Sequence, residues 1–421
     1  TVNITFGAAT QLSLKTPAVG FVNRQAFGTQ PVIEVQDVSG NAVTDSTITI
    51  EASASAGNGA VLGGTLTRTA SSGEADFGLN ASGLKLSGAV GSYTLTFGKQ
   101  GGGLTPATQT ITLVHSDAAS LAVVTPAASA TTGADFGAQP ALKLVDVDGN
   151  LVATGAGSTA TVTASLSGVG TASLSGTLTA TATGGNLAFN NLRITGDAGS
   201  YTLTYAVTSP SSLNTISTTQ SIAVGAGAAV ALVVVQQPST VQTRATMTPA
   251  PTVSLRDAWN NPVTTDSSTG VTVQLIDSTG TAASTESAAV TASSGVVTFS
   301  SIAYQTTPAD GYRLRFKLAG TSTTVNSSAF TVNPGAATEL RITSQPSAFD
   351  LSLVQSKTGE VLGGQPTVKL YDQDGNLVTT TNTGAATIAI ASTSGLTLAD
   401  GSAARLSEGT VTANFVGGVA T

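Results

Sequence analysis

Residues 30–43 read Gln-Pro-Val-Ile-Glu-Val-Gln-Asp-Val-Ser-Gly-Asn-Ala-Val, and closely similar stretches occur at residues 139–152, 251–263 and 365–378. Their prolines, Pro31, Pro140, Pro251 and Pro366, follow one another at intervals of 109, 111 and 115 residues. Each copy alternates apolar and polar residues, as expected of a strand with one buried face. A repeat of this length and regularity indicates one small domain copied along the chain.

Each copy ends in a turn that an aspartate opens and that asparagine closes. An aspartate side chain caps backbone N–H groups, and Gly and Asn tolerate a positive φ, so the pattern predicts a structural turn. Its members are Asp37, Gly40 and Asn41; Asp146, Gly149 and Asn150; Asp257 and Asn261; and Asp372, Gly375 and Asn376.

Four equivalent alanines mark the starts of the repeats: Ala9, Ala119, Ala229 and Ala337. Each leads into an apolar strand that a proline ends, as expected where an edge strand stops pairing. The pattern predicts repeats at residues 9–118, 119–228, 229–336 and 337–421, with residues 1–8 as the last strand of a preceding repeat. Since only a few residues join consecutive repeats, we expect a semi-rigid rod rather than flexibly linked domains.

Within one repeat we count about seven short alternating strands, with turns about every 8–15 residues and no helical periodicity. This pattern predicts an all-β fold, an antiparallel sandwich of the Ig-like kind. A late strand begins with Gly-x-Tyr in two repeats, at Tyr93 and Tyr201, and with Asp-Gly-Tyr in the third, at Tyr312. That placement predicts a tyrosine corner, in which the hydroxyl bonds to a loop backbone.

Three patterns together carry a resemblance to a known family. They are the strand that runs into Asp-x-x-Gly-Asn-x-Val, the Gly-rich strand that contains Phe77, Phe189 or Phe299, and the Gly-x-Tyr-x-Leu strand. The chain resembles the tandem bacterial Ig-like repeats of the invasin and intimin type, which also occur in giant bacterial adhesins, surface-layer proteins and phage structural proteins. The resemblance covers essentially the whole chain. It implies an Ig-like sandwich that serves as a spacer and display module, and it singles out no one function.

The composition excludes several classes of protein. Of 421 residues, 9% are charged and 40% are hydrophobic, so the chain is not a disordered polyelectrolyte. It has no cysteine, which excludes disulfides and thiolate metal sites. A net charge of −7 without any Lys/Arg cluster disfavours nucleic acid as a partner. No apolar run approaches the ~20 residues of a membrane helix, so we expect no membrane insertion in this segment.

The turns of the second and fourth copies resemble the start of a calcium loop. Asp146 and Asp148, and likewise Asp372 and Asp374, supply oxygen atoms at alternate positions. No further carboxylate follows, and in the other copies Ser39 and Asn260 replace the second aspartate. We therefore predict a plain turn without a cofactor, and bound calcium stays open as the alternative.

Two single residues invite a functional interpretation. Trp259, the one tryptophan, lies in the third turn, where it either packs over the end of a strand or contacts a glycan or protein partner. His115, the one histidine, has no cluster of carboxylates near it in sequence, so we expect a solvent-exposed or junction-packing role. No nucleophile, acid and base are grouped as catalysis requires, and the sequence predicts no enzyme.

The sequence thus favours a non-enzymatic structural rod of an extracellular protein on a bacterial surface: an adhesin stalk, a surface-layer component or a fibre. Its partners would be neighbouring repeats, other copies of itself or a surface glycan. Two alternatives stay open. One is a binding module that recognises a glycan or a receptor through its loop tips, and the other is a fibre or decoration protein of a virion.

The fourth copy differs from the others in two ways. An insertion of about six residues is predicted within residues 349–364, and the sequence stops one residue before the position of the core Phe189. A sandwich without most of three strands would expose a sheet edge and half its core. We therefore expect the chain to be an excerpt of a longer polypeptide. Completion of the fourth repeat by residues 1–7 of another copy is the rival hypothesis.

Overall fold

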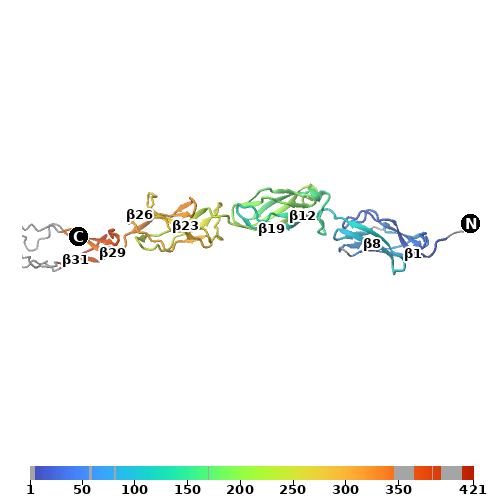
Figure 1. Cartoon of the computed structure of the whole chain (residues 1–421), viewed down its shortest axis with the longest axis horizontal. Coiled ribbons are helices and arrows are strands. Elements are labelled where there is room, and N and C mark those ends of the chain that lie inside the picture. The colour runs from blue at the N-terminus through green and yellow to red at the C-terminus, as the bar shows by residue number, and fades with distance from the viewer. Residues whose placement is uncertain are drawn as a thin grey trace, which may run out of the picture. The chain divides into compact units, whose positions relative to one another are not determined.

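The computed structural model describes residues 5–55, 59–79, 82–168, 170–345, 365–381, 383–389 and 410–421. Figure 1 shows that the described chain is built of strands joined by loops. It also contains the short 3-10 helices η1 (Ala156–Thr159) and η2 (Ser211–Leu213). Two compact units divide it, one from Thr1 to Gly225 and the other from Ala226 to Thr421. Among the described residues no helix has the length and apolarity needed to cross a membrane.

The first repeat is a sandwich of two main sheets. One sheet has the order β1 (Ala9–Thr16), β2 (Val32–Asp37) and β6 (Glu74–Asp76). The other has the order β5 (Thr67–Thr69), β3 (Thr49–Ala54), β8 (Gly91–Lys99) and β9 (Ala107–Leu113). A separate pair joins β4 (Val61–Gly63) to β7 (Lys85–Ser87). All these strand pairs are antiparallel.

The second repeat has the same plan. One sheet contains β10 (Ser120–Thr125), β12 (Ala141–Val145) and β16 (Asn186–Ala188). The other contains β11 (Ala130–Thr131), β19 (Ser217–Gly225), β18 (Gly199–Ser209), β13 (Thr161–Gly168) and β15 (Thr179–Thr181). Again a separate pair joins β14 (Ser173–Ser175) to β17 (Arg193–Thr195).

The third repeat keeps the first sheet, as β20 (Ala231–Gln236), β22 (Thr252–Arg256) and β25 (Val296–Thr298). Its second sheet contains β21 (Val241–Gln242), β28 (Phe330–Asn333), β26 (Ala309–Leu318), β23 (Gly270–Ile276) and β24 (Val290–Thr291), with β27 (Thr324–Asn326) paired to β26. Residues 229–336 are all described, and they contain no separate pair that corresponds to β4–β7 or β14–β17.

Residues 337–421 form a three-stranded sheet of β29 (Ala337–Ser344), β30 (Thr367–Asp372) and β33 (Val419–Ala420), and a pair of β31 (Ala385–Ala389) with β32 (Thr410–Asn414). The insertion predicted within residues 349–364 lies outside the described residues. So do residues 1–4 of the predicted first strand. Residues 5–8 have no regular secondary structure, and the N–H of Gly7 donates to Asp37 Oδ2 at 2.9 Å. The assignment of residues 1–8 to the last strand of a preceding repeat stays a prediction.

Three hydrophobic cores fill the spaces between the sheets. They extend from Leu12 to Leu113, from Leu121 to Val224 and from Leu232 to Val332. Each core contains an equivalent aromatic pair, with ring centroids 5.6, 5.5 and 5.1 Å apart in Phe77–Phe97, Phe189–Tyr205 and Phe299–Phe316. The first core has a second pair, Phe21–Phe27, at 5.0 Å. The structure divides a repeat into more than seven strands, because several are only two or three residues long. It also contains a short parallel pairing of β11 with β19, and of β21 with β28.

The three tyrosines predicted to form tyrosine corners are buried, and each hydroxyl donates to a backbone carbonyl just upstream. Tyr93 bonds to Ala89 O at 2.6 Å and Tyr201 to Asp197 O at 2.7 Å. Tyr312 bonds to Thr307 O at 2.9 Å. Each bond fastens the loop that leads into the long strand β8, β18 or β26.

A glutamine before the strand of the repeated stretch has a role that the sequence analysis missed. The side-chain amide of Gln30 donates to Leu84 O at 3.0 Å and accepts from Leu84 N at 2.7 Å. Gln139 pairs with Leu192 in the same way, at 3.1 and 3.0 Å. The amide therefore substitutes for one residue of a neighbouring strand. The recurrence of Gln before Pro in three of the four copies is the signal that could have revealed it.

We expect Tyr201 to act through stability. Tyr201→Phe removes one hydrogen bond of a 4%-exposed residue and should lower the free energy of unfolding by ~1 kcal/mol. Tyr201→Ala removes the ring and should cost ~3–5 kcal/mol. Denaturant unfolding followed by circular dichroism measures both changes. An alanine variant as stable as the wild type would contradict this assignment.

Candidate functional site

The aspartate that opens each turn uses one carboxylate oxygen to close that turn. The Oδ1 atom accepts the backbone N–H groups of the residues two and four positions later. In the first repeat Asp37 accepts from Ser39 and Asn41, both at 2.9 Å. The distances are 3.0 and 2.9 Å at Asp146, 2.9 Å twice at Asp257, and 2.9 and 2.8 Å at Asp372. The turn that the sequence predicts is formed by these bonds.

The second oxygen of the same carboxylate reaches a different part of the chain. Oδ2 accepts a backbone N–H from the segment that precedes the first strand of the repeat. The donors are Gly7 for Asp37 at 2.9 Å, Ser116 for Asp146 at 3.2 Å, Gly227 for Asp257 at 2.9 Å and Gly335 for Asp372 at 2.9 Å. Each aspartate thus fastens the segment through which the chain enters its repeat. We call this arrangement the junction clamp.

At the first junction the clamp is extended by side chains of the preceding repeat. Asn23, which is fully buried, donates its amide to Asp146 Oδ2 at 2.8 Å and to Asp148 Oδ2 at 2.7 Å. Arg24 binds the Asp148 carboxylate with two nitrogens, Nε at 2.7 Å and Nη2 at 2.5 Å. The guanidinium therefore makes the fork-like pairing that gives charged hydrogen bonds their directionality. These contacts cross from the first repeat to the second.

Two further residues of this junction complete the contact. Asn150, the last residue of the turn, donates its amide to Gly88 O at 2.9 Å and accepts from Val90 N at 3.0 Å. The Nε2 atom of His115 accepts from Thr154 N at 3.2 Å and lies 3.0 Å from Thr154 Oγ1. The histidine thus packs at the junction, one of the two roles expected for it.

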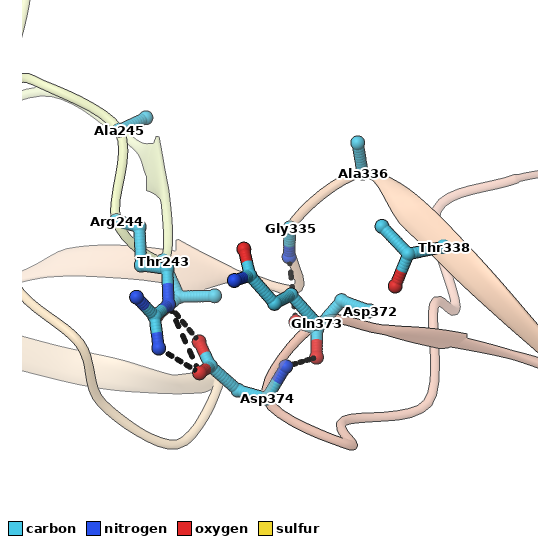
Figure 2. Close-up of a pocket in the computed structure, with 9 residues that line it drawn as sticks. All are labelled: Thr243, Arg244, Ala245, Gly335, Ala336, Thr338, Asp372, Gln373 and Asp374. Atoms are coloured by element: carbon cyan, nitrogen blue, oxygen red, sulfur yellow. Dashed lines mark hydrogen bonds and ion pairs between the residues drawn. The ribbon is translucent and has the colours of Figure 1, made fainter.

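The junction before residues 337–421 repeats this chemistry with other residues, as Figure 2 shows. Arg244 contacts Asp374 through Nε at 2.8 and 2.9 Å and through Nη2 at 2.5 Å. Gln305 adds a bond to Asp374 Oδ1 at 2.8 Å. The shallow hollow here is also lined by Thr243, Ala245, Ala336, Thr338 and Gln373. Its charged groups bind each other across the two repeats rather than facing an open cavity.

The clamp lowers the pKa values of its carboxyl groups. The N–H of Gly7, together with donors from Asn41 and Ser39, lowers the pKa of Asp37 to about 2. The Arg24 guanidinium is the main cause that lowers the pKa of Asp148 to about 2. At Asp146 and Asp372 burial acts to raise the pKa, but hydrogen bonds chiefly from Asn150 and Asn376 outweigh it, so both pKa values are lowered.

The register of the third turn corrects one detail of the sequence analysis. Trp259 N donates to Asp257 Oδ1 just as Asp148 N donates to Asp146 Oδ1, so Trp259 takes the place of the second aspartate. Asn260 has a φ of 66° and takes the place of Gly149, at 84°. The prediction that Asn260 replaces the second aspartate is therefore wrong, since the residue two positions after Asp257 is Trp259. The Trp259 side chain is 38% exposed.

The four aspartates considered for calcium already have protein partners. Asp148 is bonded to Arg24 and Asn23, and Asp374 to Arg244 and Gln305. Within the described ranges, no three His, Asp or Glu side chains come together as a metal site. Arg24, Arg244 and Asn23 were missed by the sequence analysis. Asn23-Arg24 and Thr243-Arg244 lie in the repeats that precede the two Asp-x-Asp turns. No sequence motif marks these pairs, so the sequence analysis had no signal for them.

We predict that the clamp makes the fold acid-sensitive. A carboxyl group whose pKa is lowered on folding contributes stability above its ordinary pKa, and this contribution is lost as the pH falls. For Asp37 the loss should occur from about pH 4 down to about pH 2. Denaturant unfolding at pH 5, 4, 3 and 2 should show that Asp37→Asn narrows its gap to the wild type over this range. A constant gap for Asp37→Asn over this range would contradict the assignment.

We also predict that calcium has no effect on stability. Arginine nitrogens occupy the oxygens of Asp148 and Asp374 that a calcium ion would need. Thermal melts of the chain in EDTA and in millimolar calcium should therefore coincide. A melting temperature that rises by many degrees with calcium would show that the turns bind the ion.

No protein-family model matches the sequence, and no curated protein does. Several solved structures match at low identity. FdeC, an adhesin of Escherichia coli, is 18% identical over 77% of this chain and 99% of its own, with a TM-score of 0.38. Invasin, a bacterial integrin-binding protein, is 14% identical over 96% of this chain and 79% of its own, with a TM-score of 0.34. A β-glycosidase from Bacteroides vulgatus is 14% identical over 52% of this chain, with a TM-score of 0.23, and this chain spans 25% of it.

The fold assignment depends on the strand pairing and the cores described above. Each of the first three repeats packs a three-stranded sheet against a larger, mainly antiparallel sheet, with a tyrosine that fastens the loop before a long central strand. The chain is a tandem array of Ig-like β-sandwiches, and it is similar to the invasin-type repeats of bacterial adhesins.

Proposed function

We propose that this chain is a non-enzymatic structural segment of an extracellular bacterial surface protein, in which clamped repeats carry a more distal element. The observation that carries the proposal is the junction clamp. A carboxylate inside each of the four repeats is bonded to the segment through which the chain enters that repeat. A spacer needs its joints fixed in this way, whereas a binding or catalytic domain needs a fixed pocket.

Backbone conformation supports the same function. Arg24 and Arg244 adopt φ values of 64° and 69°, a region that disfavours residues other than glycine, asparagine and aspartate. The corresponding residue of the second repeat is Gly133, at 81°. A non-glycine residue in this conformation costs conformational free energy. The fork-like ion pairs with Asp148 and Asp374 offset that cost, which favours a role for both arginines in the joint.

The polar groups of the junctions also suit a joint better than an active site. Arg24, Asn23 and Asp148 bind one another, and so do Arg244, Gln305 and Asp374. Catalysis needs a group that is held ready for a substrate. Neighbouring repeats are then the principal protein partners of each repeat, and the bacterial surface is the proposed location.

A second candidate function is a binding module, and the exposure of Trp259 favours it. An aromatic side chain that is 38% exposed at a turn can stack on a sugar or anchor a protein partner. The replacement Trp259→Ala separates the two functions. It should abolish binding to a glycan or cell-surface receptor if the turn is a binding site, and it should leave attachment unchanged if the repeats act as a spacer.

The spacer function predicts that the orientation of the second repeat relative to the first depends on Arg24. The chain has no cysteine, so Thr110→Cys and Thr219→Cys place two spin labels at exposed sites on β9 and β19. Pulsed electron spin resonance on the full chain then measures the distance distribution between the repeats. We expect Arg24→Ser to broaden this distribution, because it removes the bidentate bond to Asp148.

Arg193→Ser is the matched control. Arg193 forms an exposed ion pair with Asp135 at 3.2 Å inside the second repeat, and its loss should leave the distribution unchanged. Asp148→Asn should broaden the distribution as Arg24→Ser does, since it removes the same charge pair. Equal widths for the wild type, Arg24→Ser and Asp148→Asn would refute the proposed role of the clamp.

A further inference from the structure

The third repeat differs from the first two by one missing strand. In the first repeat β4 pairs with β7, and in the second β14 pairs with β17. All four strands are only three residues long. We call β4 and β14 the outer strands, and the middle residue of each is a leucine. Leu62 and Leu174 are partly buried and pack against the cores of their repeats. The third repeat has no outer strand at this place.

Hydrogen bonds define which residues of the third repeat correspond to β7. The carbonyls of Leu84 and Leu86 accept from Phe27 N at 3.0 Å and from Arg24 N at 2.8 Å. In the third repeat the carbonyls of Ile302 and Tyr304 accept from Met247 N at 2.9 Å and from Arg244 N at 2.7 Å. Ala303 and Gln305 therefore stand where Lys85 and Ser87 stand in the first repeat.

In the first repeat those two residues are paired with β4, Lys85 with Gly63 and Ser87 with Val61. In the third repeat the N–H and C=O groups of Ala303 and Gln305 have no hydrogen-bond partner within the described chain. Both residues are exposed. Unpaired backbone groups along an extended segment are the template to which a further strand adds.

In the third repeat, the segment that follows β23 pairs with β23 instead of forming an outer strand. After β23 the chain turns at Asp277, whose Oδ1 accepts from Thr279 N and Thr281 N at 2.9 Å each. It then returns along β23, where Ala283 N bonds to Leu275 O at 2.8 Å and Ser287 N to Val273 O at 2.9 Å. The segment that could have formed an outer strand is therefore bound to the edge of the other sheet.

A hollow remains beside the unpaired edge. Its floor is largely apolar, with Val273, Val290, Phe299, Ile302 and Tyr304 among the lining residues. Serines 287, 300 and 301 lie among its other lining residues, and no charged side chain lines it. The hollow lies between β23 and the segment equivalent to β7, and β4 lies near both corresponding strands in the first repeat. Its place is thus that of the leucine-bearing strand.

We propose that this edge and hollow bind an extended peptide segment of a partner protein by strand addition. The segment runs antiparallel to residues 302–305 and bonds to the N–H and C=O groups of Ala303 and Gln305. Its central side chain is aliphatic, leucine in the simplest case, and enters the hollow. Small uncharged residues flank it, as Ser173 and Ser175 flank Leu174.

The chain supplies its own probe. A synthetic peptide with the sequence of residues 170–177, Gly-Thr-Ala-Ser-Leu-Ser-Gly-Thr, carries the outer strand of the second repeat. Amide hydrogen exchange, detected by NMR on the full chain, reports on each backbone group. At millimolar peptide we expect exchange at Ala303 and Gln305 to slow by at least about tenfold, which corresponds to at least 90% occupancy. Exchange at Arg193 and Thr195, which are paired within the second repeat, should stay slow throughout.

Controls separate the backbone contacts from the hollow. The same peptide with Leu174→Asp should give no protection, and equal protection would overturn the leucine assignment. Ser300→Tyr fills the hollow from an exposed position and Ala303→Pro removes one N–H, so both should abolish the effect in chains that remain folded by circular dichroism. Unchanged exchange at millimolar wild-type peptide would overturn the proposal. Protection that grows with protein concentration alone would also overturn it, in favour of a second copy of this chain.

Discussion

A single carboxylate group connects the inside of each repeat to the segment that leads into it. One oxygen of Asp37, Asp146, Asp257 or Asp372 closes the turn after the second long strand, and the other accepts an N–H from the entering chain. The aspartates are at most 4% exposed, so the bonds are shielded from water. Turn geometry and junction geometry are therefore determined by the same side chain. A substitution that alters the turn should therefore also alter the geometry of the junction.

Much of the fold could be predicted from the sequence, because short local patterns determine its strands and turns. Alternating residues give strands, Asp-x-x-Gly-Asn gives a turn, and Gly-x-Tyr gives a buried hydroxyl beside a loop carbonyl. The recurrence of these patterns reveals the number of copies. The short strands β4 and β14 were not predicted, since three residues carry too little periodicity to mark a strand.

The side chains that complete the site could not be found in this way. Arg24 and Asp148 are 124 residues apart, and Arg244 and Asp374 are 130 apart. No local sequence rule couples such positions, and only the packing of one repeat against the next brings them together. Trp259 is a different case, because the sequence already places it two residues after Asp257, as Asp148 lies two residues after Asp146. Its backbone N–H makes the same bond to the aspartate that opens the turn.

The clamp also has a consequence for how such arrays change by duplication. The arginine belongs to one repeat and the aspartate to the next, so a copied repeat carries one half of two different joints. Duplication of the second repeat in tandem would place a turn with Asp148 after a repeat that offers Gly133 in the arginine position. Arg24 and Asp148 are 124 residues apart, which is more than the 109 residues from Pro31 to Pro140, so a copied segment of that length cannot carry both partners of this joint. The order of the repeats is thus constrained, because a repeat with the arginine must precede a repeat whose turn carries the second aspartate.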